Sequence, residues 1–257
     1  MKAVILAGGL GTRMREETEF KPKPMVEIGG KPVLWHIMNS FALQGIRDFV
    51  ILAGYRANMV KDYFLNLEAY TNDFTVSWGE NREIELLGGS RPDWSVTVLD
   101  TGIDSETGGR LAQARAVLAG ERFVCTYGDG LASVSIRDLI RCHSDAGTVG
   151  TVTVTKPTNR FGIVRADAHG RVLSFEEKPQ MADLVNIGYF VFEPNVFDFI
   201  DEKVSLERGL LRALVGDSQL AAYEHLGFWE PMDTYREFRL LNDLWNRGER
   251  PWVPKND

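Results

Sequence analysis

Short apolar runs rich in β-branched residues alternate with amphipathic segments along the first 148 residues of the chain. Such runs are typical of buried strands, and apolar positions that repeat every three or four residues are typical of helices. The predicted strands are Lys2–Leu6, Asp48–Ala53, Phe74–Trp78, Ser95–Leu99 and Arg122–Tyr127, and the predicted helices are Pro32–Gln44, Arg56–Leu67, Leu111–Leu118 and Ile136–His143. This alternation predicts a Rossmann-like α/β fold with a mixed, mainly parallel sheet flanked by helices.

The pattern changes after about residue 148, where strands follow one another with few helices between them. The predicted strands are Gly150–Thr155, Gly162–Arg165, Val172–Glu176 and Val185–Glu193, and the predicted helices are Pro194–Ile200, Leu206–Val215 and Thr234–Asn246. No internal repeat or low-complexity linker separates the two parts. We therefore predict one domain over residues 1–257, in which the second half extends the same sheet.

Composition narrows the class of protein. A formal net charge of −7 disfavours a nucleic-acid surface, which needs patches of Lys and Arg, although a local cationic pocket remains compatible with it. No apolar run approaches eighteen residues, so no membrane span is expected. The N-terminus is interpreted as a strand and not a signal peptide. Cys125 and Cys142 are expected to be free thiols in a reducing compartment, which favours a cytoplasmic location.

A glycine-rich loop, Ala7–Arg13, directly follows the first predicted strand. Gly8, Gly9 and Gly11 have no side chain to separate the backbone from a ligand, and successive N–H groups in such a loop can converge on an anion. The dinucleotide pattern fails because it needs glycine at Met14, and the P-loop pattern fails because it needs glycine at Arg13. The loop is either a phosphate site of another kind or a plain tight turn.

The stretch KPKP at 21–24 places two lysines before prolines. A residue before proline is restricted to extended backbone conformations, so Lys21 and Lys23 lose less entropy when their ammonium groups are held in place. A solvated basic loop is the alternative, but the position just after the glycine loop favours a role in binding.

Two aspartates stand at the ends of apolar stretches. Asp129 lies in TYGDG and Asp233 lies in WEPMDT. Asp129 alone could form an Asx turn, and Asp233 could cap the helix predicted at Thr234–Asn246. Together they fit a hard cation such as Mg²⁺, which prefers oxygen ligands and retains water and substrate phosphates.

LAGGLGTRM and KPKPMVEIGGKPVLWH together resemble the signature of the sugar-1-phosphate nucleotidyltransferases. Further matches are TGGRL, TYGDG, NRFG, FEEKP, NIGYFV and GFWEPMDT. Among them TGGR, TYGDG and WEPMDT together point to the cytidylyltransferase branch of that superfamily. The resemblance covers almost the whole chain. It implies a glycosyltransferase-A-like fold and the Mg²⁺-dependent reaction of CTP with α-D-glucose 1-phosphate, which gives CDP-glucose and pyrophosphate by direct in-line attack. It also implies polysaccharide biosynthesis as the context.

The resemblance assigns the nucleotide mainly to residues 1–148 and the sugar phosphate mainly to residues 149–257. The implied nucleotide-binding residues are Leu6, Ala7, Gly8, Gly9, Leu10, Gly11, Thr12, Arg13, Lys23, Thr107, Gly109, Arg110 and Gly128. Arg110 is expected to contact the pyrimidine carbonyl or a phosphate, with a surface arginine at a helix start as the alternative.

The implied sugar-phosphate residues are Gly162, Glu177, Lys178 and Asn186. Asn186 could instead satisfy a buried strand edge, and FEEKP could be a solvated hairpin turn. The resemblance makes Asp129 and Asp233 the Mg²⁺ ligands, and the implied catalytic residues are Arg13, Lys23 and Lys178.

Three alternatives stay open. The chain could be a uridylyl- or thymidylyltransferase acting on a hexose 1-phosphate, or a non-catalytic nucleotide-sugar-binding regulatory subunit. A dinucleotide oxidoreductase is disfavoured by the missing third glycine. The four histidines show no metal or nucleophile spacing, and His36 is expected to be structural. We expect a homo-oligomer, for which the polar stretch Gly79–Asp93 is a candidate interface element.

Overall fold

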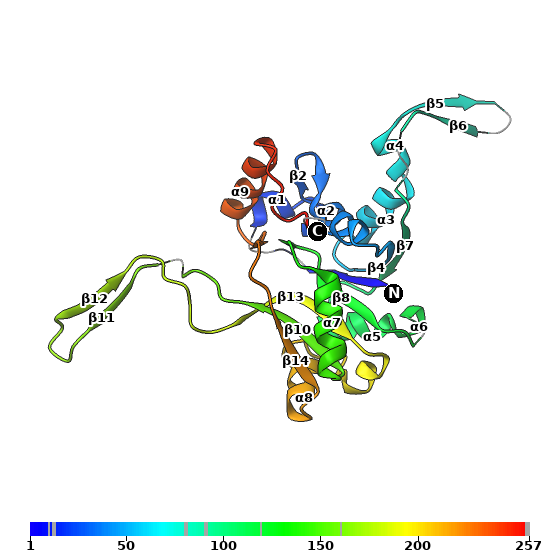
Figure 1. Ribbon diagram of the computed structural model, residues 1–257. Helices are drawn as coiled ribbons and strands as arrows, with labels where there is room; N and C mark the ends of the chain where they lie inside the picture. The colour runs from blue at the N-terminus through cyan, green and yellow to red at the C-terminus, as the bar shows by residue number, and fades with distance from the viewer. Residues whose placement is uncertain are drawn as a thin grey trace.

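The computed structural model describes residues 1–9, 11, 14–79, 82–89, 92–118, 120–159 and 161–254, without the side chains of residues 15 and 16. Its centre is a seven-stranded sheet of order β14-β10-β13-β8-β1-β4-β7 (Figure 1). The strands are β1 (Ala3–Ala7), β4 (Asp48–Ala53), β7 (Ser95–Asp100), β8 (Phe123–Tyr127), β10 (Gly150–Thr155), β13 (Val185–Phe192) and β14 (Leu220–Glu224). The sheet is continuous across residue 148, as predicted; the division of labour between the two halves stays a prediction.

The sheet is mixed because one strand runs against its neighbours. β1 pairs in parallel with β4 and β8, β4 pairs in parallel with β7, and β10 pairs in parallel with β14. β13 is antiparallel to both β8 and β10. The predicted mixed, mainly parallel α/β fold is therefore confirmed.

Alternation along β1 shows that both faces of the sheet are buried. Ala3 and Ile5 belong to one hydrophobic cluster, and Val4 and Leu6 belong to the other. Helices α2 (Val33–Leu43), α3 (Ala57–Leu65), α7 (Ile136–Ala146) and α9 (Tyr235–Asn246) contribute to the first cluster. Helices α5 (Thr107–Gln113), α6 (Arg115–Leu118), η3 (Pro194–Phe199) and α8 (Leu210–Gly216) contribute to the second. This two-sided burial explains why the strands read as continuous apolar runs.

Several predicted elements differ from the observed ones. The helix predicted at Leu111–Leu118 begins earlier, at Thr107, and is divided into α5 and α6. The helix predicted at Leu206–Val215 begins only at Leu210, and Pro194–Phe199 is a 3-10 helix. The polar stretch Gly79–Asp93 contains a strand, β6 (Arg82–Leu87), that has no buried face and therefore no strong apolar signal.

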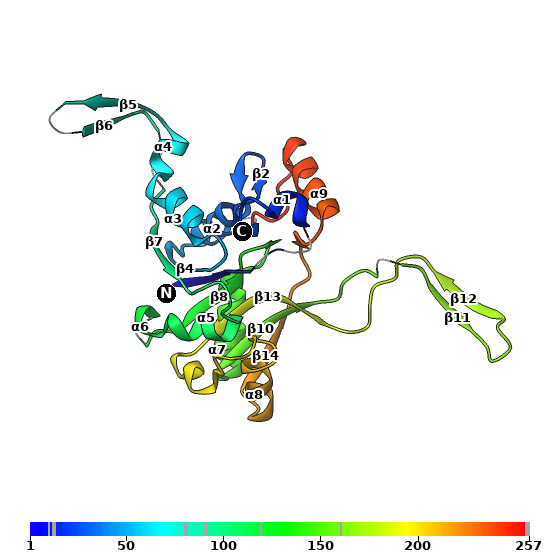
Figure 2. The same ribbon diagram turned by 180° about the vertical axis from the view of Figure 1, so that it is seen from behind.

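Two predicted strands of the second half lie outside the main sheet, contrary to expectation. β11 (Ile163–Ala166) and β12 (Val172–Glu176) form a separate antiparallel ribbon. A similar ribbon joins β5 (Asp73–Trp78) to β6 after the short helix α4 (Leu67–Thr71). Both ribbons project from the body on opposite sides (Figures 1 and 2). We call the described residues of 72–89 the first arm and those of 156–181 the second arm.

The remaining short elements lie around one edge of the sheet. They are α1 (Arg15–Thr18), η2 (Lys23–Met25), β2 (Glu27–Ile28), β3 (Lys31–Pro32), β9 (Gly130–Ala132) and β15 (Trp229–Pro231). In the described part of the chain, no helix has the length and apolar character that a bilayer crossing requires.

His36 is structural, as predicted. Its Nε2 lies 2.8 Å from the carbonyl oxygen of Ile28, and its ring meets those of Trp245 and Trp252 edge-on. Burial lowers the pKa of His36 from 6.5 to about 4. The folded protein therefore holds a neutral imidazole that donates its Nε2 proton to Ile28.

This burial predicts a loss of stability in acid. Below pH 6.5 the unfolded chain binds a proton at His36 that the folded chain does not bind until about pH 4. The contribution of neutral His36 to the free energy of unfolding should therefore be fully present above pH 6.5. It should fall, by up to about 3 kcal/mol, as the pH drops to 4. We expect His36→Gln, which keeps an N–H donor, to show a smaller drop in melting temperature over this range than the wild type. The exposed His169→Gln should follow the wild type, and equal pH slopes for all three proteins would contradict the assignment.

Candidate active site

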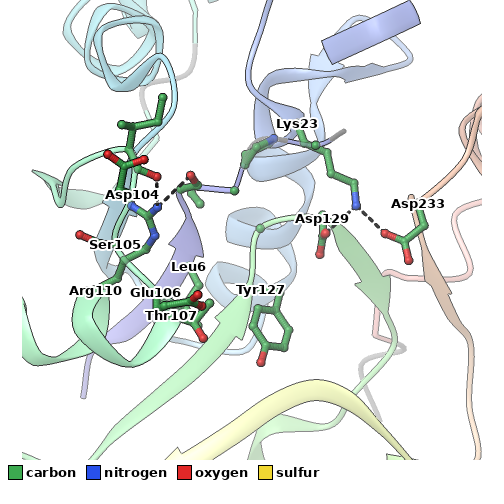
Figure 3. Close-up of a pocket in the computed structure, with 17 residues that line it drawn as sticks. Leu6, Lys23, Asp104, Ser105, Glu106, Thr107, Arg110, Tyr127, Asp129 and Asp233 are labelled. Atoms are coloured by element: carbon green, nitrogen blue, oxygen red, sulfur yellow. Dashed lines mark hydrogen bonds and ion pairs between the residues drawn. The ribbon is translucent and has the colours of Figure 1, made fainter. Parts of the chain in front are cut away.

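A cavity of about 480 Å³ opens at the carboxyl ends of the parallel strands β1, β7 and β8 (Figure 3). This edge is where open α/β sheets bind ligands. The cavity is lined by Leu6, Ala7, Gly8, Gly9, Gly11, Lys23, Pro24, Ile103, Asp104, Ser105, Glu106, Thr107, Arg110, Tyr127, Gly128, Asp129 and Asp233. The structure thus brings most of the predicted nucleotide residues together with both predicted metal ligands.

Arg110 forms the floor beneath the glycine loop. Its side chain is only 4% exposed, and its guanidinium donates hydrogen bonds to the carbonyl oxygens of Gly8, Gly102 and Ile103 and to the hydroxyl of Thr101. A further, longer bond of 3.4 Å reaches the carbonyl oxygen of Ala53. These acceptors follow or end three neighbouring strands, so one buried cation ties together the carboxyl ends of β1, β4 and β7.

This packing explains why Gly8 cannot carry a side chain. A Cβ on Gly8 would lie 2.2 Å from the guanidinium carbon of Arg110, and a Cβ on Gly54 would lie 2.3 Å from its Nη1. A Cβ on Gly9, by contrast, would meet nothing within 4 Å. Gly8 is therefore required by the protein interior, whereas Gly9 faces the open cavity.

Gly11 is required for a different reason, which is its backbone conformation. Its φ of +63° is a conformation that other residues rarely adopt, and its carbonyl oxygen accepts bonds from the Met14 amide and the Thr18 hydroxyl. Gly11 is thus required by its own backbone conformation. The predicted contacts of Leu10, Thr12 and Arg13 lie outside the described residues.

Lys23 lies at the centre of the site. It belongs to η2, where Pro22 and Pro24 flank it, and its side chain is almost fully buried. Its Nζ is 2.6 Å from Oδ2 of Asp129 and 2.7 Å from Oδ1 of Asp233 (Figure 3). The alternative of a solvated basic loop therefore does not apply to Lys23. It does describe Lys21, which is partly exposed and lies 3.6 Å from Glu27.

A short ribbon brings the two aspartates together. Strand β9 begins directly after Asp129 and pairs with β15, which ends two residues before Asp233. The amide of Met232 donates to the carbonyl oxygen of Asp129 at 2.8 Å. The cap of helix α9 is Thr234, which forms a capping box with Glu237. The Asp233 carboxylate is therefore not the helix cap, and it is directed to Lys23.

A second cavity, of about 270 Å³, adjoins the first. Both are lined by Tyr127, Asp129 and Asp233, so the lysine–aspartate cluster marks their junction. Asn186 lines the second cavity, while its Oδ1 accepts a hydrogen bond from the Gly188 amide. Asn186 is exposed, so it does not satisfy a buried strand edge, and its contact with the sugar phosphate stays a prediction.

The structure does not bring the other three predicted sugar-phosphate residues into either cavity. Gly162, Glu177 and Lys178 lie on the second arm, away from the body. Lys178 Nζ is 3.5 Å from its neighbour Glu177, and both side chains are exposed. Gly162 makes room within the arm, because a Cβ there would lie 2.7 Å from the ring of Phe175.

Two other predicted nucleotide residues have structural roles. The Thr107 hydroxyl accepts a hydrogen bond from the Leu206 amide at 2.8 Å, although Thr107 also lines the first cavity. Gly109 packs against the loop before α8, since a Cβ there would lie 2.5 Å from the carbonyl oxygen of Glu202. Their small size serves packing between α5 and that loop.

The sequence interpretation missed the segment Ile103–Glu106, all four residues of which line the first cavity. The signal that could have found them is positional: they connect the end of strand β7 to helix α5, at the binding edge of the sheet. Tyr127 was also missed, although it lines both cavities and its hydroxyl donates to the Glu207 carboxylate.

The two carboxylates fit a divalent cation in the chemistry of their donors. Asp129 and Asp233 converge on one point, which is taken by the Lys23 ammonium group. Among the described residues, no group of three or more Asp, Glu, His or Cys side chains forms a closed metal cage. Two carboxylates with room for water and phosphate are the arrangement that Mg²⁺ prefers.

The chain is similar to known proteins over most of its length. Residues 2–230 match the family described as "Nucleotidyl transferase". The chain is 48% identical over 255 residues to the glucose-1-phosphate cytidylyltransferase of Salmonella typhi, and this covers 98% of both chains. It is 41% identical to the probable glucose-1-phosphate cytidylyltransferase of Bacillus subtilis, covering 98% of this chain and 99% of that one.

Solved structures of low sequence identity share the fold. A putative glucose-1-phosphate thymidylyltransferase from Bacillus anthracis superimposes with a TM-score of 0.65 at 20% identity, covering 95% and 94% of the two chains. A UDP-glucose pyrophosphorylase in complex with UDP-glucose superimposes with a TM-score of 0.68 at 15% identity, covering 96% and 99%. On the family match and on identity over nearly the full chain, this protein belongs to the nucleotidyl transferase family.

Proposed function

We propose that this protein transfers a cytidylyl group from CTP to α-D-glucose 1-phosphate, giving CDP-glucose and pyrophosphate. The observation that carries the proposal is the 48% identity, over 98% of both chains, to a glucose-1-phosphate cytidylyltransferase. Two adjoining cavities with a shared lysine–aspartate cluster support it, because the reaction needs two bound anions whose phosphates meet. We expect the reaction to take place in the cytoplasm and to supply polysaccharide biosynthesis.

The chain's own groups can position both reactants. In this proposal the backbone of Gly8, Gly9 and Gly11 holds the triphosphate of CTP, together with the predicted contacts of Leu10, Thr12 and Arg13. The sugar phosphate occupies the second cavity, which Asn186 lines. One oxygen of its phosphate then attacks the α-phosphorus in line, the bond from that phosphorus to the bridging oxygen breaks, and pyrophosphate leaves. No covalent intermediate with the enzyme is required.

In this proposal, Lys23 stabilises the negative charge of the phosphate that is attacked. Its ammonium is bonded to Asp129 and Asp233, which line both cavities, so it lies where the α-phosphate and the attacking phosphate would meet. Positive charge placed there in advance favours the transition state, in which negative charge builds up on the transferred group. Lys178 is proposed to align the sugar phosphate, and Glu177 to accept hydrogen bonds from sugar hydroxyls.

Asp129 and Asp233 are the residues that would hold Mg²⁺. When bound, the ion supplies positive charge that offsets the charge of the α- and β-phosphates and of the departing pyrophosphate. With both carboxylates committed to the ion, the Lys23 ammonium would be available to substrate oxygens.

Arg110 and Ile103–Glu106 line the first cavity together. We expect the base of the nucleotide to bind next to them. The Nη donors of Arg110 are engaged with backbone and hydroxyl acceptors, so we propose that Arg110 shapes this part of the cavity as well as contacting the nucleotide. A pocket built largely from backbone groups can discriminate cytosine from uracil by the opposite hydrogen-bonding character of their C4 substituents. Uridylyl or thymidylyl transfer is the alternative, and a non-catalytic regulatory subunit is the alternative of another class.

The reaction itself is tested by measuring pyrophosphate release. The purified protein should release pyrophosphate from CTP in the presence of glucose 1-phosphate and Mg²⁺, with lower kcat/KM for UTP, dTTP, ATP and GTP. EDTA should abolish turnover and added Mg²⁺ should restore it. Preference for UTP or dTTP would establish the first alternative, and nucleotide binding without pyrophosphate release would establish the second.

The two adjacent glycines predict contrasting effects. Gly8→Ala should lower the melting temperature by several degrees, because its Cβ would displace a guanidinium held by several hydrogen bonds, at a cost of about 1–3 kcal/mol. Gly9→Ala should leave the melting temperature unchanged and raise KM for CTP, because its methyl group would enter the space proposed for the triphosphate. A normal KM in Gly9→Ala would remove this part of the loop from nucleotide binding.

Replacing Lys23 with methionine keeps the apolar stem and removes the charge. We expect kcat to fall by about a hundredfold or more, equivalent to about 3 kcal/mol of transition-state stabilisation. Lys21→Met is the matched control, because Lys21 precedes the other proline of KPKP and pairs only loosely with Glu27. If Lys23→Met changed KM for CTP with kcat intact, its proposed role in the transition state would be wrong.

A further inference from the structure

Tyr127 forms part of the wall that the two cavities share. It is the last residue of β8, and it lines the first cavity as well as the second (Figure 3). Asp129, two residues further along the chain, lines both cavities too. A side chain in this position borders the space in which two neighbouring ligands would approach each other. The contacts that hold Tyr127 in place therefore bear on how the two ligands meet.

The Tyr127 ring packs against the adjacent strand β13. A Cβ on Gly188 would lie 2.3 Å from ring atom Cδ2 of Tyr127, so glycine leaves the room that the ring needs. The ring of Phe190 meets that of Tyr127 edge-on, with their centroids 6.0 Å apart. A phenylalanine at position 127 would make the same two contacts, so they do not explain the hydroxyl.

The Tyr127 hydroxyl donates its hydrogen bond to the carboxylate of Glu207, which lies 80 positions later in the chain. Burial raises the pKa of Tyr127, and the negative charge of Glu207 raises it further, so the hydroxyl keeps its proton at neutral pH. Glu207 itself is exposed and is not among the described residues that line either cavity. Its contact with the cavity wall is therefore made through Tyr127.

The residue before Glu207 is firmly anchored. Leu206 is fully buried in the second hydrophobic cluster, and its amide donates to the Thr107 hydroxyl at 2.8 Å. Thr107 lines the first cavity, and a Cβ on its neighbour Gly108 would lie 2.5 Å from the carbonyl oxygen of Val204. The exposed Glu207 side chain thus extends from a backbone that the core and the start of α5 hold in place.

The segment 201–209 therefore supports two walls that come from other parts of the chain. It reaches Thr107 at the start of α5 through Leu206, and it reaches Tyr127 at the end of β8 through Glu207. Both supported residues lie in the first half of the chain, whereas the segment itself belongs to the second half. The contacts join the position of one wall to that of the other.

We propose that Glu207 is a positioning residue for the reaction: by holding the Tyr127 hydroxyl, it fixes the wall beside which the nucleotide and the sugar phosphate are aligned for in-line attack. The inference rests on the proposed function for the identity of the two reactants. In-line attack depends on the relative position of the reactants and not only on how tightly each one binds. A displaced wall should therefore lower kcat more than it raises either KM.

The hydrogen bond is tested by removing each partner. We expect Glu207→Leu and Tyr127→Phe each to lower kcat by about tenfold, and to change KM for CTP and for glucose 1-phosphate by less than about threefold. Glu207→Gln keeps a carbonyl oxygen that can accept from the Tyr127 hydroxyl, so it should retain most of the wild-type kcat. Unchanged kcat in Glu207→Leu, or an equal loss in Glu207→Gln, would overturn the proposal.

The matched control is Glu202→Leu, which should keep the wild-type kcat. Glu202 is an exposed glutamate of the same segment, and the atoms with which it approaches Gly109 belong to its backbone. The melting temperature of Glu207→Leu should stay within about 4 °C of the wild type, the shift expected for the loss of one hydrogen bond. A larger shift, or an equal loss of kcat in Glu202→Leu, would indicate a structural role of the segment and would overturn the proposal.

The double variant tests whether Glu207 acts through Tyr127. If it does, Tyr127→Phe combined with Glu207→Leu should be no slower than the slower of the two single variants, because both changes break the same hydrogen bond. Losses that multiply, to about a hundredfold in total, would show that Glu207 acts by another route and would overturn the proposal.

The position of the ring can be measured independently of the reaction. With ¹³C-labelled tyrosine rings, the NMR signal of Tyr127 is identified by its loss in Tyr127→Phe. Glu207→Leu should shift this signal, and Glu202→Leu should leave it unchanged. If the wild-type protein released no pyrophosphate from any nucleotide, the proposed function would fail, but this measurement would still test the contact. An unshifted Tyr127 signal in Glu207→Leu would overturn the proposal in either case.

Discussion

The ion cluster of Lys23, Asp129 and Asp233 is the interaction around which the site is built. Two carboxylates that approach one point in a partly buried setting repel each other, and each loses part of its hydration. The Lys23 ammonium makes this arrangement stable by bonding to both, at 2.6 and 2.7 Å. Because the three residues come from η2, the end of β8 and the end of β15, their attraction brings together segments up to 210 positions apart in the chain.

Near this cluster, a single arginine holds the backbone at the carboxyl ends of β1, β4 and β7. Arg110 bonds to acceptors that follow three parallel strands, and Gly8 and Gly54 leave space for its guanidinium. Gly8 is therefore already held in place before an anion binds, so less binding energy is lost to reorganisation at this position. The same arginine is thus a structural element of the floor and part of the wall of the cavity.

The body and the arms differ in how they are stabilised. Both faces of the seven-stranded sheet are buried by helices, and the two clusters include nearly every residue of β1 and β4. The arms lie outside these clusters, and many of their large apolar side chains are exposed. The arms are therefore the parts of the described chain that the hydrophobic core stabilises least.

The sequence predicted much of the body from local signals. The strand runs of β1, β4, β8, β10 and β13 were located within one or two residues, because burial on both faces produces uninterrupted apolar runs. The glycine loop, Lys23 and the two aspartates were also identified, because each has a residue type and a position at the end of an element that suit phosphate or metal chemistry. β6 and the late start of α8 were missed, because exposed strands and short helices carry weak periodicity.

The sequence by itself therefore determined the α/β sheet and the candidate residues for phosphate binding, since these depend on patterns along one segment at a time. The family followed from the resemblance of its motifs to those of known proteins. Only the tertiary structure decided which of the candidate residues meet. It joined Lys23 to both aspartates, placed Ile103–Glu106 in the cavity, and directed the Nη groups of Arg110 to backbone oxygens. It also placed Lys178 on an arm outside both cavities. These outcomes depend on contacts between distant segments, whose geometry no local pattern encodes.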